Sequence, residues 1–220
     1  MIKIGVLSDT HNMLRPQVTA QLSQCKMILH AGDICRTEIL EKLKTIAPVR
    51  AVRGNNDKEW AKTIPYIDTF DCYGIQILMC HKKKEIPKIL SGINLVIYGH
   101  SHQYEDKELN GIRFLNPGSC GPRRFNQEVT MAILEIDKNH SYRINRIVFS
   151  DIQSKKIDIP DANQDRAKII SAVIKDIDKG IPSDKIAKKN HISLAFTEEI
   201  SRMYLTHPGI NLDGILNRLQ

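Results

Sequence analysis

Short apolar runs alternate with helix-like segments along the first hundred residues of the chain. The runs are continuous and rich in β-branched residues, a pattern typical of buried strands. The predicted strands are Ile2–Leu7, Met27–His30, Val49–Val52, Ile75–Met79 and Leu95–Tyr98. The segments between them predict helices at Gln17–Leu22, Glu38–Leu43 and Ile86–Leu90. Strand–helix–strand repeats of this length favour a sheet with parallel strands and crossover helices.

The pattern changes to one of hairpins after residue 102. Gln103–Leu109 and Ile112–Leu115 flank the pair Asn110-Gly111, which tolerates the positive φ angles of a type I′ turn. Two further alternating segments, Val129–Ile136 and Tyr142–Phe149, indicate a second hairpin. We therefore expect an α/β half followed by an antiparallel half.

The last third of the chain has a different composition. The stretch from Ser150 to Asp165 is polar and contains Pro160, which indicates a linker. After it, an Ile and Val stripe with helical spacing ends at Gly180, a residue type that commonly closes helices. Three shorter groups predict three more helices: Ile186 with Ala187, Ile200 with Met203 and Tyr204, and Ile215 with Leu216. The predicted organisation is a first domain at 1–150, a linker at 151–164 and a helical module at 165–220.

Bulk composition describes an ordinary globular chain. Of its 220 residues 41% are hydrophobic and 26% are charged, which excludes disorder throughout. No apolar stretch is long enough for a membrane span, and the N-terminus lacks the features of a signal peptide. The five cysteines are scattered and odd in number, which argues against a disulfide framework. We therefore expect a cytoplasmic protein with no membrane partner.

The net charge of +7 is concentrated in the first domain. Residues 1–150 contain 21 Lys and Arg against 15 Asp and Glu, whereas residues 151–220 contain 11 against 10. The basic excess therefore does not lie in a C-terminal tail, and nucleic acid becomes a less favoured partner. A basic first domain is equally suited to an anionic small-molecule substrate.

Polar motifs follow each of the five predicted strands. They are Asp9-Thr10-His11, Gly32-Asp33, Gly54-Asn55-Asn56-Asp57, His81 and Gly99-His100-Ser101-His102. Ligands bind at this edge of open α/β sheets because the loops there line a crevice. Asp9 and His11 are two positions apart, and in an extended chain such side chains point the same way. The sequence therefore predicts one site that combines carboxylate, amide and imidazole groups.

Seven of these side chains are candidate metal ligands: Asp9, His11, Asp33, Asn55, His81, His100 and His102. Oxygen and nitrogen ligands without thiolate are typical of sites that bind manganese, iron, zinc or nickel, and are not typical of a structural zinc site built from cysteines. Seven ligands are too many for one ion, but if one carboxylate bridges they supply four bonds to each of two divalent ions. Two such ions and two aspartates leave a formal charge of +2, which favours an anion such as a phosphate group.

Taken together, these motifs resemble those of the calcineurin-like metallophosphoesterases. The residues that carry the resemblance are Asp9-x-His11, Gly32-Asp33, Gly54-Asn55-x-Asp57, His81 and Gly99-His100-x-His102. Their short spacing and the later Asn116-Pro117-Gly118-Ser119 resemble the small prokaryotic phosphodiesterase branch. The resemblance covers about residues 1–150 and implies a four-layer α/β/β/α sandwich of two facing mixed sheets. The helical C-terminal extension lies outside it.

The resemblance also implies a role for each ligand. One metal would be held by Asp9, His11, Asp33 and His102, and the other by Asp33, Asn55, His81 and His100. Asp33 would bridge the ions, and a metal-bridging hydroxide would attack phosphorus in line. The implied cofactor is a pair of divalent ions, with manganese favoured over iron, nickel and zinc. The implied substrate is a phosphate ester or nucleotide, with a diester favoured over a monoester.

One position departs from the family pattern. In many members a histidine that contacts the phosphate and protonates the leaving group follows the ligand asparagine, but here that residue is Asn56. Its amide can donate a hydrogen bond but cannot supply a proton. General acid catalysis is typically worth about 10²–10⁴-fold. We therefore expect Asn56 to contact substrate at the catalytic site of an enzyme that favours good leaving groups.

Two basic groups are secondary candidates for substrate contact. Arg123, just after the Asn-Pro-Gly-Ser turn, could bind a phosphate group in bidentate fashion. The run Lys82-Lys83-Lys84 follows His81 and could steer an anionic substrate, although such runs are more often solvated loops.

Two alternative functions remain open. The chain could be a non-catalytic metal-binding scaffold, as the retromer subunit of the family is, although every ligand position is intact here. It could also be a regulator whose tail binds DNA, because the segment from Ile186 to Ile200 resembles a helix-turn-helix. The absence of the usual turn glycine, Thr197 at an apolar position and the nearly neutral charge argue against DNA binding. A packing or homo-oligomerisation module is the favoured interpretation.

Overall fold

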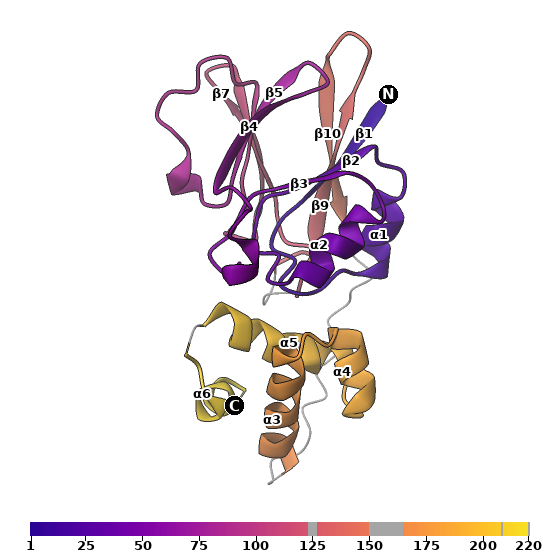
Figure 1. The fold of residues 1–220 in the computed structure, drawn as a ribbon, viewed down its shortest axis with the longest axis vertical. Helices are drawn as coiled ribbons and strands as arrows, with labels where there is room; N and C mark the ends of the chain where they lie inside the picture. Colours follow the sequence, from indigo (N-terminus) through magenta and orange to yellow (C-terminus); the bar gives the residue numbers. More distant parts are fainter. Residues whose placement is uncertain (123–126, 150–164, 208, 220) are drawn as a thin grey trace. The chain divides into compact units, whose positions relative to one another are not determined.

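The protein forms two compact units. The computed structural model describes residues 1–122, 127–149, 165–207 and 209–219. The first unit comprises the described residues up to 121 and from 127 to 149, and the second contains the helices from residue 165 onward (Figure 1). Among the described residues, none of the helices has the length and apolar character that crossing a membrane requires.

The first sheet is mixed and has the strand order β10-β9-β1-β2-β3. Its strands are β1 (Ile2–Leu7), β2 (Met27–His30), β3 (Val49–Ala51), β9 (Thr130–Ile136) and β10 (Tyr142–Val148). Strands β1, β2 and β3 are parallel, whereas β9 runs antiparallel to β1. The crossover helices α1 (Pro16–Leu22) and α2 (Thr37–Lys44) connect the parallel strands, as the alternating pattern predicts.

The second sheet is also mixed and has the order β4-β5-β6-β8-β7. Its strands are β4 (Ile67–Cys72), β5 (Ile75–Cys80), β6 (Leu95–Ile97), β7 (Tyr104–Leu109) and β8 (Ile112–Pro117). Two 3-10 helices, η1 (Glu59–Ala61) and η2 (Lys83–Glu85), lie in its connections. The β7–β8 turn has positive φ at both Asn110 (52°) and Gly111 (75°), which confirms the predicted type I′ hairpin.

The main core lies between the two sheets. Alternate residues of β1, such as Ile4 and Val6, pack there against Ile77, Met79 and Ile97 of the second sheet. The opposite face of the first sheet packs against α1 and α2, and the opposite face of the second packs against the segment around Ile86–Ile93. These layers confirm the four-layer α/β fold class with two facing mixed sheets and additional C-terminal helices.

Three details of the sequence-based prediction are wrong. Ile86–Leu90 is not helical, because Pro87 disfavours the helical region for the residue before it, and Ile86 is extended (φ −64°, ψ 124°). Strand β4 was not predicted, since its polar residues face outward along half of its length. The predicted antiparallel half is also not wholly antiparallel, because β8 pairs in parallel with β6, while β9 and β10 return to the first sheet beside β1.

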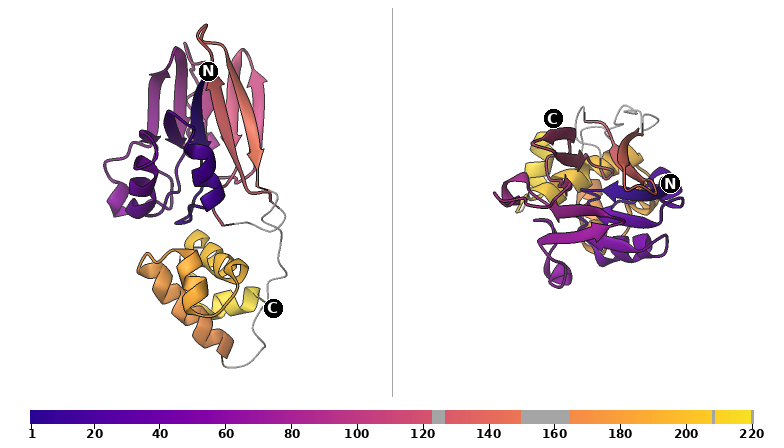
Figure 2. Two further views of the ribbon diagram at one scale, coloured as in Figure 1. Left: turned by 90° about the vertical axis from the view of Figure 1, so that its right-hand side faces the viewer. Right: turned by 90° about the horizontal axis from the view of Figure 1, so that it is seen from above.

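Four helices form the second unit. They are α3 (Asp165–Asp178), α4 (Ser183–Lys189), α5 (Leu194–Thr206) and α6 (Leu212–Arg218). Figure 2 shows these helices packed against one another in orange and yellow. Their shared core includes Ile170, Val173, Ile186, Phe196 and Ile215. Gly180 ends α3 with a φ of 77°, so the predicted helix stop is correct.

The α4–α5 connection resolves two sequence objections to helix-turn-helix geometry. His191 adopts the left-handed conformation (φ 53°) that a turn glycine usually supplies. The buried Thr197 donates its hydroxyl to the Ser193 carbonyl at 3.1 Å, so its polar atom is satisfied inside the helix. Ser193 in turn caps α5 by accepting a hydrogen bond from Phe196 N.

Candidate metal centre

The polar motifs that follow five strands from both sheets meet at one edge of the first unit. Asp9 and His11 follow β1, Asp33 follows β2, and Asn55 and Asn56 follow β3 in the first sheet. In the second sheet, His81 follows β5, and His100 and His102 follow β6. The site therefore draws on both sheets, which is why its residues are spread over some hundred positions of the chain.

The backbone is left-handed at five of the seven candidate ligands. The φ angles are 54° at Asp9, 42° at His11, 57° at Asp33, 72° at His100 and 59° at His102. The extended geometry assumed from the sequence for Asp9 and His11 is therefore wrong, although the side chains do meet. Non-glycine residues in this region each cost on the order of 1–3 kcal/mol and cluster at functional sites.

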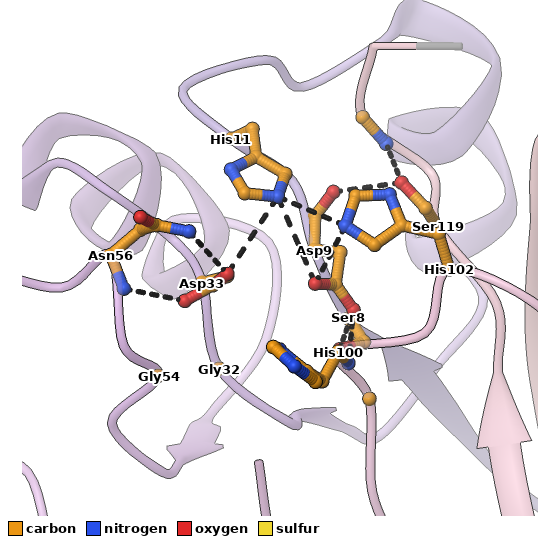
Figure 3. Close-up of polar contacts among 12 residues, drawn as sticks. Ser8, Asp9, His11, Gly32, Asp33, Gly54, Asn56, His100, His102 and Ser119 are labelled. Atoms are coloured by element: carbon orange, nitrogen blue, oxygen red, sulfur yellow. Dashed lines mark hydrogen bonds and ion pairs between the residues drawn. The ribbon is translucent and has the colours of Figure 1, made fainter. Parts of the chain in front are cut away.

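Asp9, His11 and His102 form the first ligand group. His102 Nε2 lies 3.0 Å from Asp9 Oδ1 and 3.1 Å from His11 Nε2. All three side chains are buried, and Figure 3 shows them pointing toward one another. Burial raises the pKa of Asp9, but His102 and the other nearby histidines outweigh burial and lower that pKa below its ordinary value.

Asp33, His81 and His100 form the second ligand group. His81 Nδ1–H donates to the Ala31 carbonyl at 2.7 Å, so Nε2 is the ring nitrogen that faces the site. That Nε2 atom lies 3.4 Å from Asp33 Oδ2. Burial lowers the pKa of His81, but the Asp33 carboxylate outweighs burial and raises it to about 9. Burial conversely raises the pKa of Asp33, while His81 lowers it to about 2.

Asp33 lies between the two groups. Its Oδ2 atom is 3.7 Å from His11 Nε2 of the first group and 3.4 Å from His81 Nε2 of the second. Its carboxylate also accepts two hydrogen bonds from Asn56, one from the backbone N (2.8 Å) and one from Nδ2 (2.7 Å) (Figure 3). Asn56 therefore contacts a candidate ligand directly in this structure.

Buried hydrogen bonds orient the first-group carboxylate. Ser8 Oγ donates to Asp9 Oδ2 at 2.6 Å, and His100 N donates to the same oxygen at 3.0 Å. Both bonds use Oδ2 and leave Oδ1 facing the histidines. Ser119 Oγ fixes the backbone here by donating to the Asp9 carbonyl at 2.9 Å. The apolar-run pattern gave no signal for Ser8, because it is a small polar residue at the end of β1.

Asp57 joins the loops that follow β2 and β3. Its carboxylate accepts hydrogen bonds from the backbone N atoms of Asp33 (3.0 Å), Cys35 (2.6 Å) and Gly54 (2.7 Å). A carboxylate with three backbone donors is a loop-organising group. The sequence motif contains Asp57, but only the structure shows that it positions Asp33.

His30 plays a similar part between the loops after β1 and β2. Gly32 N donates to His30 Nδ1 at 3.2 Å, so Nε2 carries the proton and donates to Thr10 Oγ1 at 3.0 Å. Burial lowers the pKa of His30 to about 3. This histidine is therefore neutral and structural. Cys35 places its Sγ 3.4 Å from His11 Nδ1.

Glycines before the ligand residues allow the loops to approach closely. A Cβ on Gly54 would lie 2.2 Å from Asp33 Oδ1, and one on Gly32 would lie 2.8 Å from His81 Nδ1. A Cβ on Gly99 would lie 1.8 Å from Ser8 Oγ. The glycine in each of these motifs is therefore required by contact distance, independently of turn formation.

The other sequence candidates have different positions. Asn55 is exposed and lines a cavity beside His81. Arg123 lies outside the described residues. Within the lysine run, Lys82 lines the same cavity, whereas Lys83 forms an ion pair with Glu105 at 2.9 Å. Only part of the run is therefore placed near the site.

The donor set fits divalent cations. His11 Nε2 and His102 Nε2 lie 3.1 Å apart, and both are close to Asp9 Oδ1. Their lone pairs would repel each other unless a proton or a cation lies between them. Among the described residues, the buried His81 Nε2 has no partner with hydrogen-bond geometry. A buried polar atom without a partner is costly, and a metal ion would satisfy it. Carboxylate and imidazole ligands without thiolate match manganese, iron, nickel or catalytic zinc.

Comparison with known proteins agrees with the site chemistry. Residues 2–139 match the family model described as a calcineurin-like phosphoesterase superfamily domain. A probable metallophosphoesterase of Methanothermobacter thermautotrophicus is 31% identical over 148 residues, which are 61% of this chain and 86% of that protein. A phosphodiesterase of Methanocaldococcus jannaschii is 30% identical over 141 residues, 54% of this chain and 84% of its own. Helices α3–α6 lie beyond the family match.

Solved structures share the fold of the first unit. Vps29 of Entamoeba histolytica complexed with zinc is 25% identical, with a TM-score of 0.52 over 67% of this chain and 99% of that one. A structure described as a novel archaeal phosphodiesterase is 22% identical, with a TM-score of 0.53 over 66% of this chain and all of that chain. The latter likeness shows the fold alone.

Proposed function

The chain belongs to the calcineurin-like phosphoesterase superfamily, and on that premise we propose that it is a two-metal phosphodiesterase. The observation that carries the proposal is the pair of three-residue ligand groups with Asp33 between them. A site with one such group would suit a single ion, whereas two adjacent groups suit a phosphoryl group held from both sides.

The ligands would be divided between the ions as the two groups suggest. Asp9, His11 and His102 would hold one ion, and Asp33, His81 and His100 the other. Asp33 would be shared, and Asn55 would complete the second set. When bound, the two ions supply Lewis acidity at the phosphoryl oxygens and an acidified water as the nucleophile for in-line displacement. Manganese is our first choice, and zinc is the ion named with the Vps29 relative.

The chain's own residues prepare the site for those ions. Ser8 and the His100 backbone hold Asp9 Oδ2, so Oδ1 is directed to the metal position. The Ala31 carbonyl holds the proton of His81 on Nδ1 and keeps Nε2 available as a ligand. Fixing the protonation and orientation of ligands before the substrate arrives lowers the reorganisation that catalysis requires.

Charge favours an anionic substrate with a good leaving group. The first domain carries most of the +7 net charge, and bound divalent ions would add to it. Asn56, 2.7 Å from Asp33, can donate a hydrogen bond to a phosphate oxygen but cannot protonate a leaving alkoxide. Diesters and aryl esters are therefore better substrates than alkyl monoesters.

The two alternatives are less well supported. A metal-binding scaffold does not require a second ligand group, whereas in this chain two adjacent groups flank Asp33. In the helical unit, α5 would be the groove-reading helix of a helix-turn-helix, but it contains Glu198 and Glu199, which DNA phosphates repel. We propose that α3–α6 form a packing or homo-oligomerisation module.

Metal analysis combined with hydrolysis tests the proposal. Wild type loaded with Mn²⁺ should hydrolyse bis(p-nitrophenyl) phosphate faster than p-nitrophenyl phosphate, and a chelator should abolish both activities. Asp33→Asn and His81→Ala should each lose activity and bound metal. His140→Ala is the matched control, because that exposed histidine contacts the Tyr73 carbonyl and none of the ligand groups. Full activity in Asp33→Asn would overturn the assignment of the shared ligand.

A further inference from the structure

A cavity of about 260 Å³ opens beside the second ligand group. Its lining includes Arg53, Asn55, Tyr66, His81, Lys82 and Glu85. Since His81 belongs to both the cavity and the ligand group, a phosphate ester bound at the metals would place one of its organic groups within reach of this space. Sites for whole drug-sized ligands measure about 300–1,000 Å³, so this cavity suits one part of a ligand.

Tyr66 is the aromatic member of the cavity lining. Its side chain is 58% exposed, which is unusual for a large ring in a folded unit. The Arg53 guanidinium lies over the ring at 5.3 Å from its centroid. Arg53 is itself fixed, because it donates to the carbonyls of Asp57 (3.0 Å) and Lys58 (3.1 Å). The ring is thus supported at the cavity by an immobilised side chain.

The backbone also fixes the segment that carries Tyr66. Arg53 N donates to the Pro65 carbonyl at 2.7 Å, which ties the residue before Tyr66 to the loop after β3. That loop also supplies Asn55 and Asp57. The position of the aromatic ring is therefore coupled to the loop that contacts Asp33.

The charges of the cavity lining are balanced. Arg53 and Lys82 are cationic, and Asp57 and Glu85 are anionic. Glu85 accepts a hydrogen bond from Lys82 N at 3.0 Å, and Asp57 accepts from three backbone donors. A neutral lining with one exposed ring does not favour a second phosphate. It favours an uncharged planar group that can stack.

We propose that this cavity, the Tyr66 cavity, binds the aromatic group of the phosphate ester, either a nucleobase or an aryl ring, and that Tyr66 determines this specificity by stacking. This inference rests on the proposed function, since the metals would hold the phosphate. Stacking on an aromatic side chain changes binding by about tenfold or more per ring. Selectivity for aromatic esters should therefore follow Tyr66.

Calorimetric titration of the full-length, Mn²⁺-loaded protein tests the proposal without relying on turnover. The probes are methyl phosphate, phenyl phosphate and thymidine 5′-monophosphate, which share a phosphate group and differ in the organic group. Both aromatic probes should bind about tenfold tighter than methyl phosphate. Tyr66→Ala should remove that difference and leave methyl phosphate binding unchanged, whereas Tyr66→Phe should retain it. Tighter binding of the nucleotide than of phenyl phosphate would identify a nucleobase as the occupant, and equal binding would identify any aryl ring.

Tyr73→Ala is the matched control, because Tyr73 is also exposed (42%) but lies in the β4–β5 turn. Equal affinity of wild type for all three probes would overturn the inference, as would an equal loss for all three in Tyr66→Ala. Failure of the proposed function gives a different result, namely no metal-dependent hydrolysis of bis(p-nitrophenyl) phosphate. Aromatic selectivity that depends on Tyr66 in such an inactive protein would still support the cavity as the binding site.

Discussion

Gly99 is the position where a single methyl group should damage the metal centre most directly. In Gly99→Ala the new Cβ would lie 1.8 Å from Ser8 Oγ and 2.7 Å from Asp9 Oδ2. The backbone has little freedom to move away, because Gly99 N donates to the His81 carbonyl at 2.9 Å and the Gly99 carbonyl accepts from Asn116 Nδ2 at 2.9 Å. Ser8 must therefore leave Asp9, or the His81 and Asn116 contacts must break.

The expected cost combines two effects. Overpacking a buried site typically costs about 1–3 kcal/mol. Losing the hydrogen bond from Ser8 Oγ to a charged carboxylate costs about 1.5–3 kcal/mol more when the carboxylate stays buried. A combined destabilisation of roughly 2.5–6 kcal/mol lowers the Tm by roughly 5–24 °C for a chain of this size. Because Asp9 is displaced, metal occupancy should fall as well.

Thermal unfolding followed by circular dichroism, with and without Mn²⁺, measures both effects. Gly111→Ala is the control, because a Cβ there meets nothing within 4 Å and only the left-handed backbone at 75° is penalised. Ser8→Ala removes the closest contact, so Gly99→Ala should cost less in that background, and the two changes should not be additive. Additive changes, or a Gly99→Ala variant with normal metal content, would refute the steric reasoning.

Three further outcomes follow from other parts of the molecule. Burial lowers the pKa of His30 to about 3, so its contribution to stability is complete above pH 6.5 and decreases as the pH falls toward 3. Urea unfolding should show a loss of about 1.4 kcal/mol per pH unit within that window, and His30→Gln should flatten the profile; an unchanged slope would contradict the assignment. Asn56→His should raise turnover on esters with poor leaving groups by about tenfold or more and change aryl diesters little; equal changes for both classes would exclude a missing general acid. The buried Asp176 accepts a hydrogen bond from Lys189 Nζ at 2.7 Å. Lys189→Met removes that donor and should lower the free energy of unfolding of the helical unit by about 1 kcal/mol. Hydrogen exchange of α3 and α4 measures this loss, Lys188→Met is the exposed control, and identical exchange in the two variants would argue against the ion pair.

The strands, and the polar residues that follow each of them, could be predicted because both depend on local sequence. A buried parallel strand such as β1 or β2 is a continuous apolar run, and the residue after it lies at the ligand-binding edge. Six candidate ligands therefore fall into two compact groups even though they come from four loops. The Asn110-Gly111 hairpin was equally local, since the turn type follows from two residues.

Other features depend on contacts that a single sequence does not reveal. The side chain of Asn55 is exposed, while the neighbouring Asn56 bonds to Asp33, and nothing in the two identical residue types distinguishes them. Asp57 acquires its role only when the loops after β2 and β3 are adjacent. The first sheet likewise depends on a distant contact, because β9 pairs with β1 although more than a hundred residues separate them in the sequence.

The left-handed backbone of several candidate metal ligands connects the sequence motifs to the chemistry of the site. Asp9, Asp33 and His100 each adopt a conformation that costs free energy, and an extended chain would avoid that cost. Hydrogen bonds donated by Ser8 and Asn116, and one that Asp57 accepts from the Asp33 backbone, stabilise these loops even without a bound cation. The fold therefore uses part of its stability to bring carboxylates and imidazoles together, and cation binding offsets the resulting repulsion and desolvation. This balance explains why the ligands within each motif are close together in the sequence while the motifs themselves are far apart. Neighbouring ligands share one strained loop, and the two sheets bring the loops together.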